Sequence, residues 1–573
     1  MIVYFDIETN GFLDDATEVV CMSVAINDRE PTIAHTKEQI LEALDCLTDA
    51  DVVVGHNIQA FDLPMLRKLY KRWKGPKGLV RDTLVMARLI YPDRRDLDIE
   101  DSSRVLPNDL IGSHSLKAWG YRLGMHKDEY IEGLQDYANL KYTPELGSYC
   151  QQDVRVTRAL YQELDKTWVS DCDALILEHD FAECIAAQVR NGFAFDGAKA
   201  AALYADLCQK RDALTDELQA LVPPTEIVLK TKTKHVPFNP GSRQQIAKYL
   251  KSQGWEPELF NESGSPKVDE AVLSKIDHPV AAKLSEYLML QKRIGMLAEG
   301  TESWMKVVKP NGRIHGSVNH NGAVTGRCTH RGPNMAQVPA SKSPYGKECR
   351  SLFIAPPGKV LIGVDAAGLE LRCLAHYLSR YDNGEFRREL LEGDIHTANQ
   401  KAAELPTRDA AKVFIYAFLY GAGPDKLGKI VGGGYDEGKA MQKRFLNKVP
   451  ALAMLKKQVE AAASLRGYLT GLDGRHLRIR SKHAALNTLL QSAGAVLMKQ
   501  ATILMNQRIR MAGLHALQVG HIHDEVQFEC PEAEAEEVSK ILEQCIKDAG
   551  EAFGFRCPLD GEARVGATWA ETH

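Results

Sequence analysis

Several features that identify common classes of protein are scarce or missing in this sequence. The 12 cysteines are scattered from Cys21 to Cys557 and form no Cys-x-x-Cys pair, which argues against a zinc module and against a dense disulfide scaffold. No apolar run approaches the roughly 18 residues needed to span a bilayer, and no basic segment opens the chain. We therefore expect a protein of a reducing, cytoplasmic compartment that is neither secreted nor inserted into a membrane.

An excess of charge of either sign is also missing. Lys and Arg number 71 and Asp and Glu number 76, which gives a formal net charge of −5. Such a balance provides no global attraction for a polyanion, so a nucleic-acid site would have to be a local basic channel. Internal repeats and low-complexity tracts are absent as well, which argues against a solenoid.

What the sequence does contain is the composition of a large folded protein. Its 573 residues, 44% hydrophobic and 26% charged, predict about four folding units rather than one small binding module or a disordered chain. Up to about residue 164, β-rich runs alternate with helical stretches such as 61–73 and 146–164, a pattern typical of an α/β domain. Residues 178–221 have helical spacing that ends before two prolines.

The second half adds a further helical region, a long polar loop and more strands. Residues 268–305 have helical spacing, and the string NGAVTGRCTHRGPNMAQVP that follows later is too rich in turn formers for a regular element. The run KVLIGV predicts a buried strand, and the chain ends with a hairpin pattern around His523. A short basic run either contacts a phosphate backbone or is a solvated loop: Lys230, Lys232, Lys234 and His235.

A first group of carboxylates lies near the start of the sequence. Asp6 and Glu8 are two residues apart in an apolar strand, so both project from one face and can bind one divalent cation. Taken alone, these two residues are explained more simply as solvated acids at a strand end. Asp62 begins a helix, where an acid is favoured at the amino-terminal end, so a plain helix cap is the alternative there.

A third segment strengthens the interpretation of these acids as a nuclease site. Tyr149 and Asp153 are four residues apart on a predicted helix and share one face, so Tyr149 could orient a nucleophilic water while Asp153 completes the cluster. Four neighbouring carboxylates repel one another unless they share cations, and two divalent ions about 3.5–4 Å apart are the recurrent solution for phosphodiester cleavage. The order DIE, NxxxFD, YxxxD resembles the proofreading 3′→5′ exonuclease domains of the ribonuclease-H fold.

A second group of chemically informative residues lies in the last third of the chain. Asp365 ends the buried strand run, where an acid is either a site residue or a helix cap. His523, Asp524 and Glu525 occupy the predicted hairpin tip. Between these segments four side chains recur every four residues along one helix: Arg408, Lys412, Tyr416 and Tyr420. This stripe is either a packed helix face or a phosphate clamp followed by aromatic rings that stack on a base.

These segments together resemble a known family. DAAGLELR, RDAAKVFIYAFLYG and HDE look like motifs A, B and C of the family A DNA polymerases, the polymerase I class, in the same order and at similar separation. NGAVTGR, GDIHTANQ and HAALNTLLQSAGA are similar to strings of the replicative polymerases of T-seven-type bacteriophages, and the resemblance covers nearly the whole chain. It implies a template-directed DNA polymerase with a 3′→5′ proofreading exonuclease that acts in viral DNA replication, in the cytoplasm of a bacterial host.

The resemblance also implies roles for individual residues. Two Mg²⁺ ions at the polymerase site, with Mn²⁺ as an alternative, would be held by Asp365, the Ala366 carbonyl and Asp524, with Glu525 alongside. Arg408, Lys412 and His396 would bind the incoming triphosphate, and Lys412 would protonate the leaving group. Tyr416 and Tyr420 would flank the nascent pair, and Glu370 with Tyr416 would exclude a ribose. The contacts to primer and template would come from Arg327, Asn487, Gln491 and His523.

At the nuclease site the resemblance implies two further Mg²⁺ ions, held by Asp6, Glu8, Asp62 and Asp153. The implied partners are primer-template DNA and deoxynucleoside triphosphates, with a replicative helicase-primase as a further candidate. The relatives recruit thioredoxin through a long thumb insertion. Here only residues 223–235 occupy that place, so we do not expect thioredoxin as a partner.

The predicted fold class is a multidomain α/β and α+β protein, with a ribonuclease-H-like exonuclease domain followed by a right-hand polymerase. The predicted domains are the exonuclease (1–167), connecting helices and thumb (168–300), first palm segment (301–370), fingers (371–477) and second palm segment (478–573). Three alternatives are weaker. A degradative nuclease or a DNA-binding scaffold would not need Asp365, Lys412 and Asp524, and a single-subunit RNA polymerase would not need Glu370 or the proofreading acids.

Overall fold

The computed structural model describes residues 1–125, 137–167, 173–228, 233–261 and 263–573. The chain forms two compact units. The first contains Met1–Asn191, Val318–Thr329 and Ile362–Val565, and the second contains Gly192–Ser317, His330–Leu361 and Gly566–His573. Both predicted constellations of site residues lie in the first unit.

The amino-terminal part of the first unit is built on a five-stranded sheet with the order β3-β2-β1-β4-β5. The pairs β1–β2 and β2–β3 are antiparallel, whereas β1–β4 and β4–β5 are parallel. The strands are β1 (Ile2–Thr9), β2 (Val19–Ile26), β3 (Thr32–Ala34), β4 (Val52–Gly55) and β5 (Leu79–Asp82). The helices are α1 (Lys37–Asp49), α2 (Asp62–Leu69), α3 (Thr83–Ile90), α4 (Arg94–Glu100), α5 (Leu116–Arg122), α6 (Pro144–Thr167) and α7 (Asp173–Asn191).

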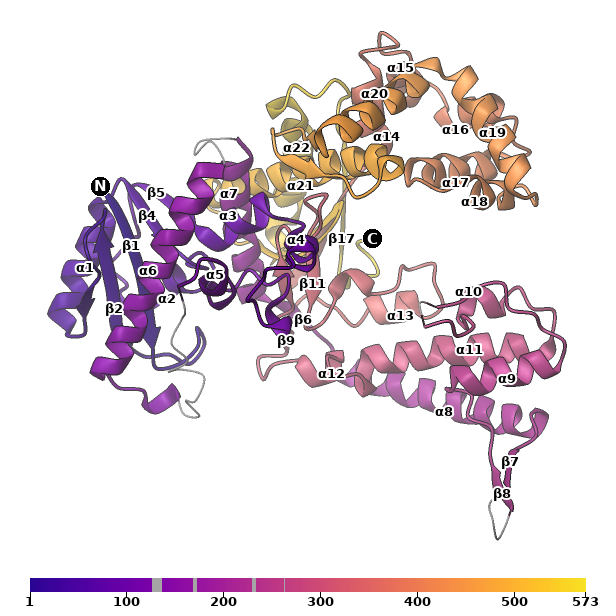
Figure 1. Cartoon of the computed structure of the whole chain (residues 1–573), viewed down its shortest axis with the longest axis horizontal. Helices are drawn as coiled ribbons and strands as arrows, with labels where there is room; N and C mark the ends of the chain where they lie inside the picture. Colours follow the sequence, from indigo (N-terminus) through magenta and orange to yellow (C-terminus); the bar gives the residue numbers. More distant parts are fainter. Residues whose placement is uncertain (126–136, 168–172, 229–232, 262) are drawn as a thin grey trace. The chain divides into compact units, whose positions relative to one another are not determined.

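The alternation of side chains along β1 determines on which face of this sheet Asp6 and Glu8 lie. Val3, Phe5 and Ile7 are buried in the core formed with α1 and α2, whereas Tyr4 points to the other face and packs among residues of α3, α5 and α6. Because successive side chains of a strand point to opposite faces, Asp6 and Glu8 share the face of Tyr4. Figure 1 shows α6 running across the sheet.

The carboxy-terminal part of the first unit contains a four-stranded sheet with the order β15-β16-β12-β17. Its strands are β12 (Lys359–Ala366), β15 (Leu517–Ile522), β16 (Glu525–Pro531) and β17 (Gly561–Gly566). A separate hairpin is made by β13 (Tyr468–Thr470) and β14 (His476–Arg478). The helices are α14 (Leu369–Leu378), α15 (Glu385–Glu392), α16 (Ile395–Ala403), α17 (Arg408–Leu419), α18 (Pro424–Lys429), α19 (Tyr435–Lys448), α20 (Pro450–Arg466), α21 (Ala485–Met511) and α22 (Ala535–Ala552).

A buried ion cluster ties α7 and α21 to the β13–β14 turn. Glu178 is fully buried and contacts Lys499 Nζ, Arg475 Nη2 at 2.7 Å and His320 Nδ1 at 2.9 Å. Arg475 also pairs with Asp473 at 2.6 Å. Burial opposes ionisation of Glu178, yet the cations of Lys499 and Arg475 hold its pKa far below the ordinary value. Burial lowers the pKa of His320 to about 4, so this imidazole is neutral at neutral pH and the two acids balance the two cations.

The second unit consists mainly of helices. Its helices are α8 (Gly197–Leu221), α9 (Arg243–Ser252), α10 (Glu270–Leu273), α11 (Pro279–Ile294), α12 (Trp304–Val307) and α13 (Gly346–Arg350). Its strands are β6 (Phe193–Ala194), β7 (Thr225–Val228), β8 (Thr233–Val236) and β9 (Arg313–Ile314). Two short strands that pair with each other, β10 (Ser317–Asn319) and β11 (Thr329–Arg331), each contain residues assigned to both units. An aromatic core contains Phe193, Phe195, Trp304, Phe353 and Trp569.

Two details differ from the pattern expected from the sequence. The helical text of residues 178–221 forms two helices, because Gly192 adopts φ +64° between α7 and β6. Of the basic run expected near residue 230, Lys234 and His235 lie on β8 of an antiparallel β7–β8 hairpin, where His235 lies 3.5 Å from Glu226. Lys234 is exposed on β8, and Lys230 and Lys232 lie outside the described residues.

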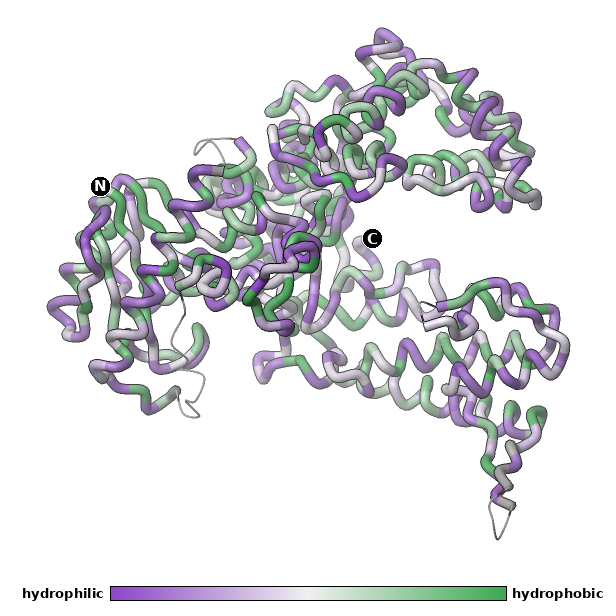
Figure 2. The backbone as a smooth tube through the Cα atoms, in the orientation of Figure 1, coloured by the Kyte–Doolittle hydropathy of each residue, from purple (hydrophilic) through white to green (hydrophobic). Residues whose placement is uncertain are grey.

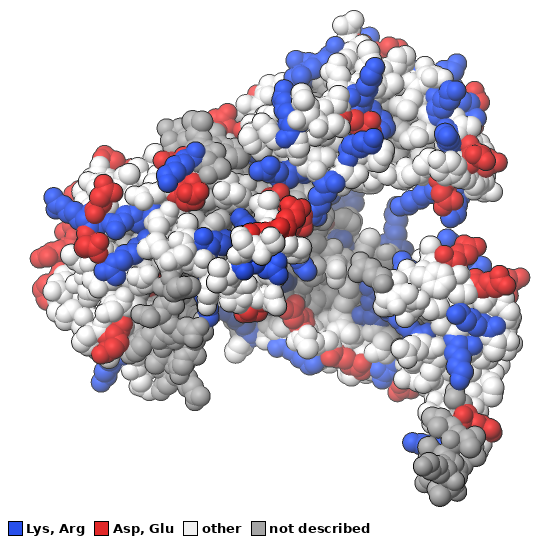
Figure 3. Space-filling view, viewed as in Figure 1, with Lys and Arg blue, Asp and Glu red and all other residues white. Residues whose placement is uncertain are grey.

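The surface and the thiols agree with the composition. Figure 2 shows apolar residues recurring along strands and helices in both units. On the face drawn in Figure 3, basic and acidic side chains are interspersed, as the near balance of the two kinds predicts. The structure describes 11 of the 12 cysteines, and each of these is a free thiol. None of the helices in the described ranges combines the length and the apolar character that crossing a membrane requires.

Two candidate active sites

The four acids predicted for the nuclease site come from three elements. Asp6 and Glu8 are half-buried on β1, Asp62 is the first residue of α2 and is 4% exposed, and Asp153 on α6 is also 4% exposed. The pKa of Tyr149 is raised by burial and by the charges of Asp153, Glu8 and Asp6, in that order. The phenol therefore lies within electrostatic range of three of the four acids.

Asp62 is not a solvated helix cap. Its carboxylate accepts a hydrogen bond from the backbone N–H of Ile7 on β1, which connects α2 to the strand that carries Asp6 and Glu8. Burial, followed by the neighbouring charge of Asp82, raises the pKa of Asp62 to about 7. Gathering several acids disfavours their ionised forms, so a cation bound among them would favour the ionised form of Asp62.

Asp82 is a buried acid beside this site that sequence reasoning missed. Its carboxylate accepts N–H bonds from Asn57 at 2.8 Å, Gln59 at 3.1 Å and Leu84 at 2.9 Å. Its own N–H donates to His179 Nε2 at 2.9 Å. Asp82 thereby caps α3 and fixes the turn that leads into Asp62. The only sequence signal is an acid immediately before a helical run, which is typical of many ordinary caps.

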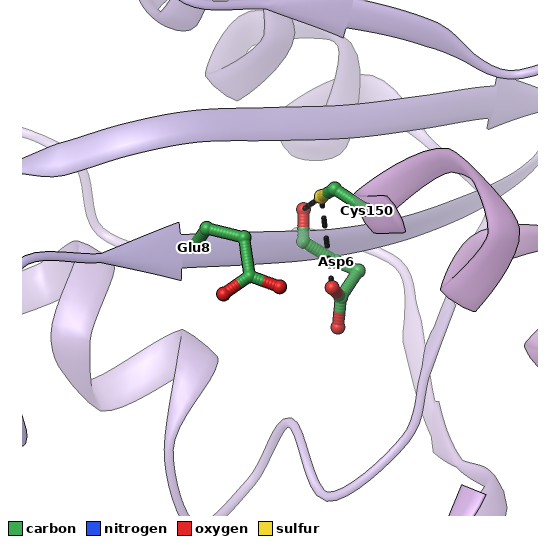
Figure 4. A group of neighbouring side chains, drawn as sticks. All are labelled: Asp6, Glu8 and Cys150. Carbon is green, nitrogen blue, oxygen red and sulfur yellow. Dashed lines mark hydrogen bonds between the residues drawn. The ribbon is translucent and has the colours of Figure 1, made fainter. Parts of the chain in front are cut away.

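The donors of this site fit hard divalent cations, because carboxylate oxygens are the ligands that such ions prefer. One further donor was not predicted. The thiol of Cys150, one residue after Tyr149, joins Asp6 and Glu8 in a group whose ligand atoms all lie within 4.8 Å of one another (Figure 4). Within the described ranges this is the only such group of three His, Cys, Asp or Glu residues that could hold a metal ion.

The two acids predicted for the second site lie at the ends of neighbouring strands. The Ala366 N–H, one residue after Asp365, donates to the Asp524 carbonyl at 3.1 Å. Asp524 lies with His523, which adopts φ +59°, in the turn between β15 and β16. Asp365 is exposed near the end of β12. Burial and the neighbouring charge of Glu370 raise the pKa of Asp524.

Glu525 occupies a different environment from its neighbour Asp524. It is 3% exposed, and its carboxylate accepts a hydrogen bond from Gln527 Nε2 at 2.7 Å. This contact holds the buried Glu525 side chain against its own strand, and its predicted place alongside Asp524 stays a prediction.

Glu370 links several of the predicted nucleotide and primer contacts. Its Oε1 accepts a hydrogen bond from Tyr420 Oη at 3.0 Å and lies 3.5 Å from Arg327 Nη2. The rings of Tyr416 and Tyr420 stack at a centroid distance of 6.5 Å. Burial and the charge of Glu370 raise the pKa of Tyr420 to about 12. Tyr420 itself is the residue immediately after α17.

Arg408 makes a contact that sequence reasoning did not foresee. Its guanidinium binds Asp394 in a bidentate pair at 2.8 and 3.2 Å. Asp394 also caps α16 through the N–H groups of His396 and Thr397. Lys412 is exposed one turn along α17, and the pKa of His396 is lowered by burial and by the nearby cations Arg408 and Lys412. Asp394 therefore pairs with the same guanidinium that is predicted to bind the triphosphate.

The remaining predicted DNA contacts lie on α21. Asn487 and Gln491 are one turn apart on this helix, so they share a face. Both are half-buried, whereas their neighbours on the helix are largely buried.

Comparison with known proteins identifies the family of the chain. A family model described as DNA polymerase family A matches residues 208–571. The chain belongs to DNA polymerase family A. A second model, of the RNase_H superfamily, matches residues 3–165 of this family A chain.

The relatives match along nearly the entire length. A DNA-directed DNA polymerase of Enterobacteria phage T3 is 37% identical over 99% of this chain and 99% of its own length, and one of Escherichia phage T7 is 36% identical with the same coverage. The polymerase domain of Pol1 from M. smegmatis, solved with DNA primer-template and dNTP, has the same fold with a TM-score of 0.79 at 20% identity. That alignment covers 99% of this chain and 96% of the solved one.

These matches confirm the predicted family and fold class, a ribonuclease-H-like domain combined with a family A polymerase domain. They also confirm the predicted enzyme class, a DNA polymerase with an exonuclease-like domain that is similar to phage polymerases. Both kinds of domain generally depend on divalent metal ions. The predicted domain boundaries and the roles of single residues stay predictions.

Proposed function

We propose that this family A polymerase extends a DNA primer on a template at the Asp365–Asp524 site and removes mispaired primer ends at the Asp6–Glu8 site. The observation that carries the proposal is the hydrogen bond between the Ala366 N–H and the Asp524 carbonyl at 3.1 Å. It brings together two acids 159 positions apart in the sequence, at the ends of the two central strands β12 and β16.

At the polymerase site, we propose that Asp365, the Ala366 carbonyl and Asp524 hold two Mg²⁺ ions, with Mn²⁺ as an alternative. When bound, such ions lower the pKa of a primer hydroxyl and offset charge on the α-phosphate. The chain's own contribution is to bind the triphosphate through Arg408, Lys412 and His396. Arg408 is already oriented by Asp394, so a phosphate can replace that carboxylate in the same bidentate geometry. Lys412 is the donor of a proton to the departing pyrophosphate.

The aromatic stripe defines the place of the nascent base pair. Tyr416 and Tyr420 offer stacked ring faces, and every base can stack on such a face. Glu370, held by Tyr420 Oη at 3.0 Å, is placed to oppose a ribose 2′-hydroxyl together with Tyr416. We assign contacts with primer and template to Arg327, Asn487, Gln491 and His523, with sequence supplied by the template.

At the nuclease site, we propose that Asp6, Glu8, Asp62 and Asp153 hold two Mg²⁺ ions. Tyr149 would orient a water toward the terminal phosphodiester, because its phenol lies among three of these carboxylates and the raised pKa keeps its proton available for donation. Asp82 acts through its neighbours, holding the turn of Asn57 and Gln59 that precedes Asp62.

Site-specific variants test the division of labour. A labelled, correctly paired primer on a longer template is incubated with Mg²⁺, with and without deoxynucleotides. Asp524→Asn should abolish extension and leave shortening intact, whereas Asp6→Asn should abolish shortening and leave extension intact. Loss of both activities in either variant, with the chain still folded, would contradict two separate sites.

We further propose that processivity does not depend on thioredoxin. The alignments with the phage T3 and T7 relatives run over 705 and 704 positions, more than the 573 residues of this chain, so both relatives carry long segments that this chain lacks. Lys234 is exposed on the β7–β8 hairpin, where it could contact a phosphate backbone. Strong stimulation of product length by added thioredoxin would refute the proposed independence from thioredoxin.

The proposed setting is replication of viral DNA in a bacterial host cytoplasm, with a helicase-primase as a candidate partner.

A further inference from the structure

The side chain of Cys150 lies beside Asp6 and Glu8, where its sulfur is a soft donor next to hard carboxylate oxygens. Cys150 on α6 is fully buried, and its Sγ lies 3.6 Å from Asp6 Oδ2 and 3.5 Å from the Asp6 carbonyl. Glu8 Oε completes a group within 4.8 Å (Figure 4). The three donors come from one strand and one helix that the fold holds together.

The spacing of sulfur and oxygen matches shared coordination of one tetrahedral cation. With a Zn–S distance of about 2.3 Å, a Zn–O distance of about 2.1 Å and a tetrahedral angle at the metal, the two ligand atoms stand about 3.6 Å apart. This is the separation between Cys150 Sγ and Asp6 Oδ2. The separation of Cys150 Sγ and Asp6 Oδ2 therefore already suits a shared cation, and the Glu8 oxygen, within 4.8 Å of both atoms, would have to move closer to join them.

A second observation on the same face of the sheet supports a ligand there. Ser23 is the cross-strand partner of Asp6 in the β1–β2 register, so its side chain lies on the face of Asp6. It is fully buried, and its hydroxyl has no hydrogen-bond partner among the described residues. A water that completes the coordination of a cation held by Asp6 can donate to this oxygen, which would satisfy it.

We propose that Asp6, Glu8 and Cys150 form a site for a thiophilic divalent cation of the Zn²⁺ class. Thiolate ligands select such ions, whereas carboxylates alone suit Mg²⁺ and Mn²⁺. Coordination releases the thiol proton to solvent and leaves the fourth position for water. Asp6 and Glu8 belong both to this site and to the proposed Mg²⁺ site for excision. A Zn²⁺ ion bound to Asp6, Glu8 and Cys150 therefore prevents these two acids from binding Mg²⁺, so Zn²⁺ should inhibit excision selectively. This consequence for excision rests on the proposed nuclease function, whereas the binding itself does not.

Spectroscopic titration of the full chain tests the binding. Cd²⁺, a probe for the Zn²⁺ class, is added to metal-free protein, the thiolate-to-metal charge-transfer absorption is followed, and Zn²⁺ is then used to displace it. Wild type and Cys46→Ser, a half-buried thiol of the same domain outside the group, should both give this band. In Cys150→Ser the band should vanish and the Zn²⁺ affinity should fall at least about tenfold, the loss typical for even an outer partner of a metal.

Two further measurements distinguish failure of the metal site from failure of the proposed nuclease function. Cys150→Ala should repeat the result of Cys150→Ser, and primer extension by both variants shows that they are folded. In Mg²⁺ buffer, added Zn²⁺ should slow excision by wild type more than by Cys150→Ser. An unchanged band and affinity in both Cys150 variants would overturn the proposal. A lost band with excision that ignores Zn²⁺ in wild type would uphold the metal site and refute the nuclease role of Asp6 and Glu8.

Discussion

Replacing Lys499 by methionine should destabilise the protein strongly, because the ammonium group is one of two cations that neutralise a buried pair of acids. Lys499 is 1% exposed and contacts Glu178, which is 0% exposed. Without Lys499 the two acids Glu178 and Asp473 share the single cation Arg475. Removing one partner of a buried ion pair costs about 3–5 kcal/mol. Arg475 remains 2.7 Å from Glu178, so we expect a loss of about 3 kcal/mol in the free energy of unfolding.

The matched control removes both charges. In Glu178→Gln combined with Lys499→Met, Arg475 and Asp473 still balance each other, and uncharged side chains of similar volume replace the pair. Stability should return to within about 1 kcal/mol of wild type, since replacing a whole buried pair is often neutral. Urea unfolding followed by circular dichroism measures both variants and yields the coupling energy. A single variant that loses under about 1 kcal/mol, or a double variant as unstable as the single one, would refute the reasoning.

The same experiment has a predicted pH dependence. His320 lies 2.9 Å from Glu178 and has its pKa lowered from 6.5 to about 4 by burial, with Arg88 and Lys499 also lowering it and Glu178 opposing them. The free energy of unfolding of wild type should therefore decrease as the pH falls from 6.5 towards 4, because the imidazole binds a proton more tightly in the unfolded chain than in the folded one. Lys499→Met raises the pKa of His320, and the imidazolium then replaces the missing cation. The difference in the free energy of unfolding between wild type and Lys499→Met should therefore be largest near pH 8 and become smaller towards pH 5.

Three further predictions concern the two sites. Asp394→Asn keeps a good helix cap on α16 but removes the negative charge that pairs with Arg408. The KM for deoxynucleotides in steady-state extension should therefore fall about two- to fivefold, with kcat unchanged. A rise in KM would show that Asp394 positions Arg408 for the nucleotide instead of competing with it. The hydroxyl of Tyr416 is proposed to fill the gap that a dideoxynucleotide leaves where its 3′-hydroxyl is missing. Tyr416→Phe should therefore lower the incorporation of dideoxynucleotides relative to deoxynucleotides, measured as a ratio of kcat/KM values. An unchanged ratio would contradict this role of the hydroxyl. Asp82→Ala leaves three N–H groups without their acceptor. The free energy of unfolding, measured by thermal unfolding, should therefore fall by about 2 kcal/mol or more, and excision should slow while extension persists. Equal effects on both activities would count against a local role of Asp82.

The residues that the sequence identified best are those whose positions follow from local periodicity. Asp6 and Glu8 share a face because a strand has a period of two, and Tyr149 and Asp153 share one because a helix returns after four residues. Asp524 was placed at a hairpin tip by the two apolar runs around it, and the structure has that turn. Family resemblance joined these local signals into two sites that lie far apart in the sequence.

The residues that the sequence did not identify act through contacts between distant segments. Asp82 accepts N–H groups of Asn57 and Gln59, 23 to 25 positions earlier, and Asp394 holds Arg408 14 positions later. Cys150 meets Asp6 across 144 positions. An Asp before a helix or a buried cysteine has many ordinary explanations, so only the tertiary fold distinguishes these three residues from structural ones.

The most direct test of the central claim uses a primer whose last nucleotide is mispaired with the template. Wild type with Mg²⁺ and all four deoxynucleotides should first remove that nucleotide and then extend the primer to full length. Asp6→Asn should leave the mispaired primer largely unextended, and Asp524→Asn should shorten it without extension. Full-length product from Asp6→Asn that matches wild type in rate and in corrected sequence would contradict the account, because the mispair would then have been removed without the Asp6 and Glu8 site.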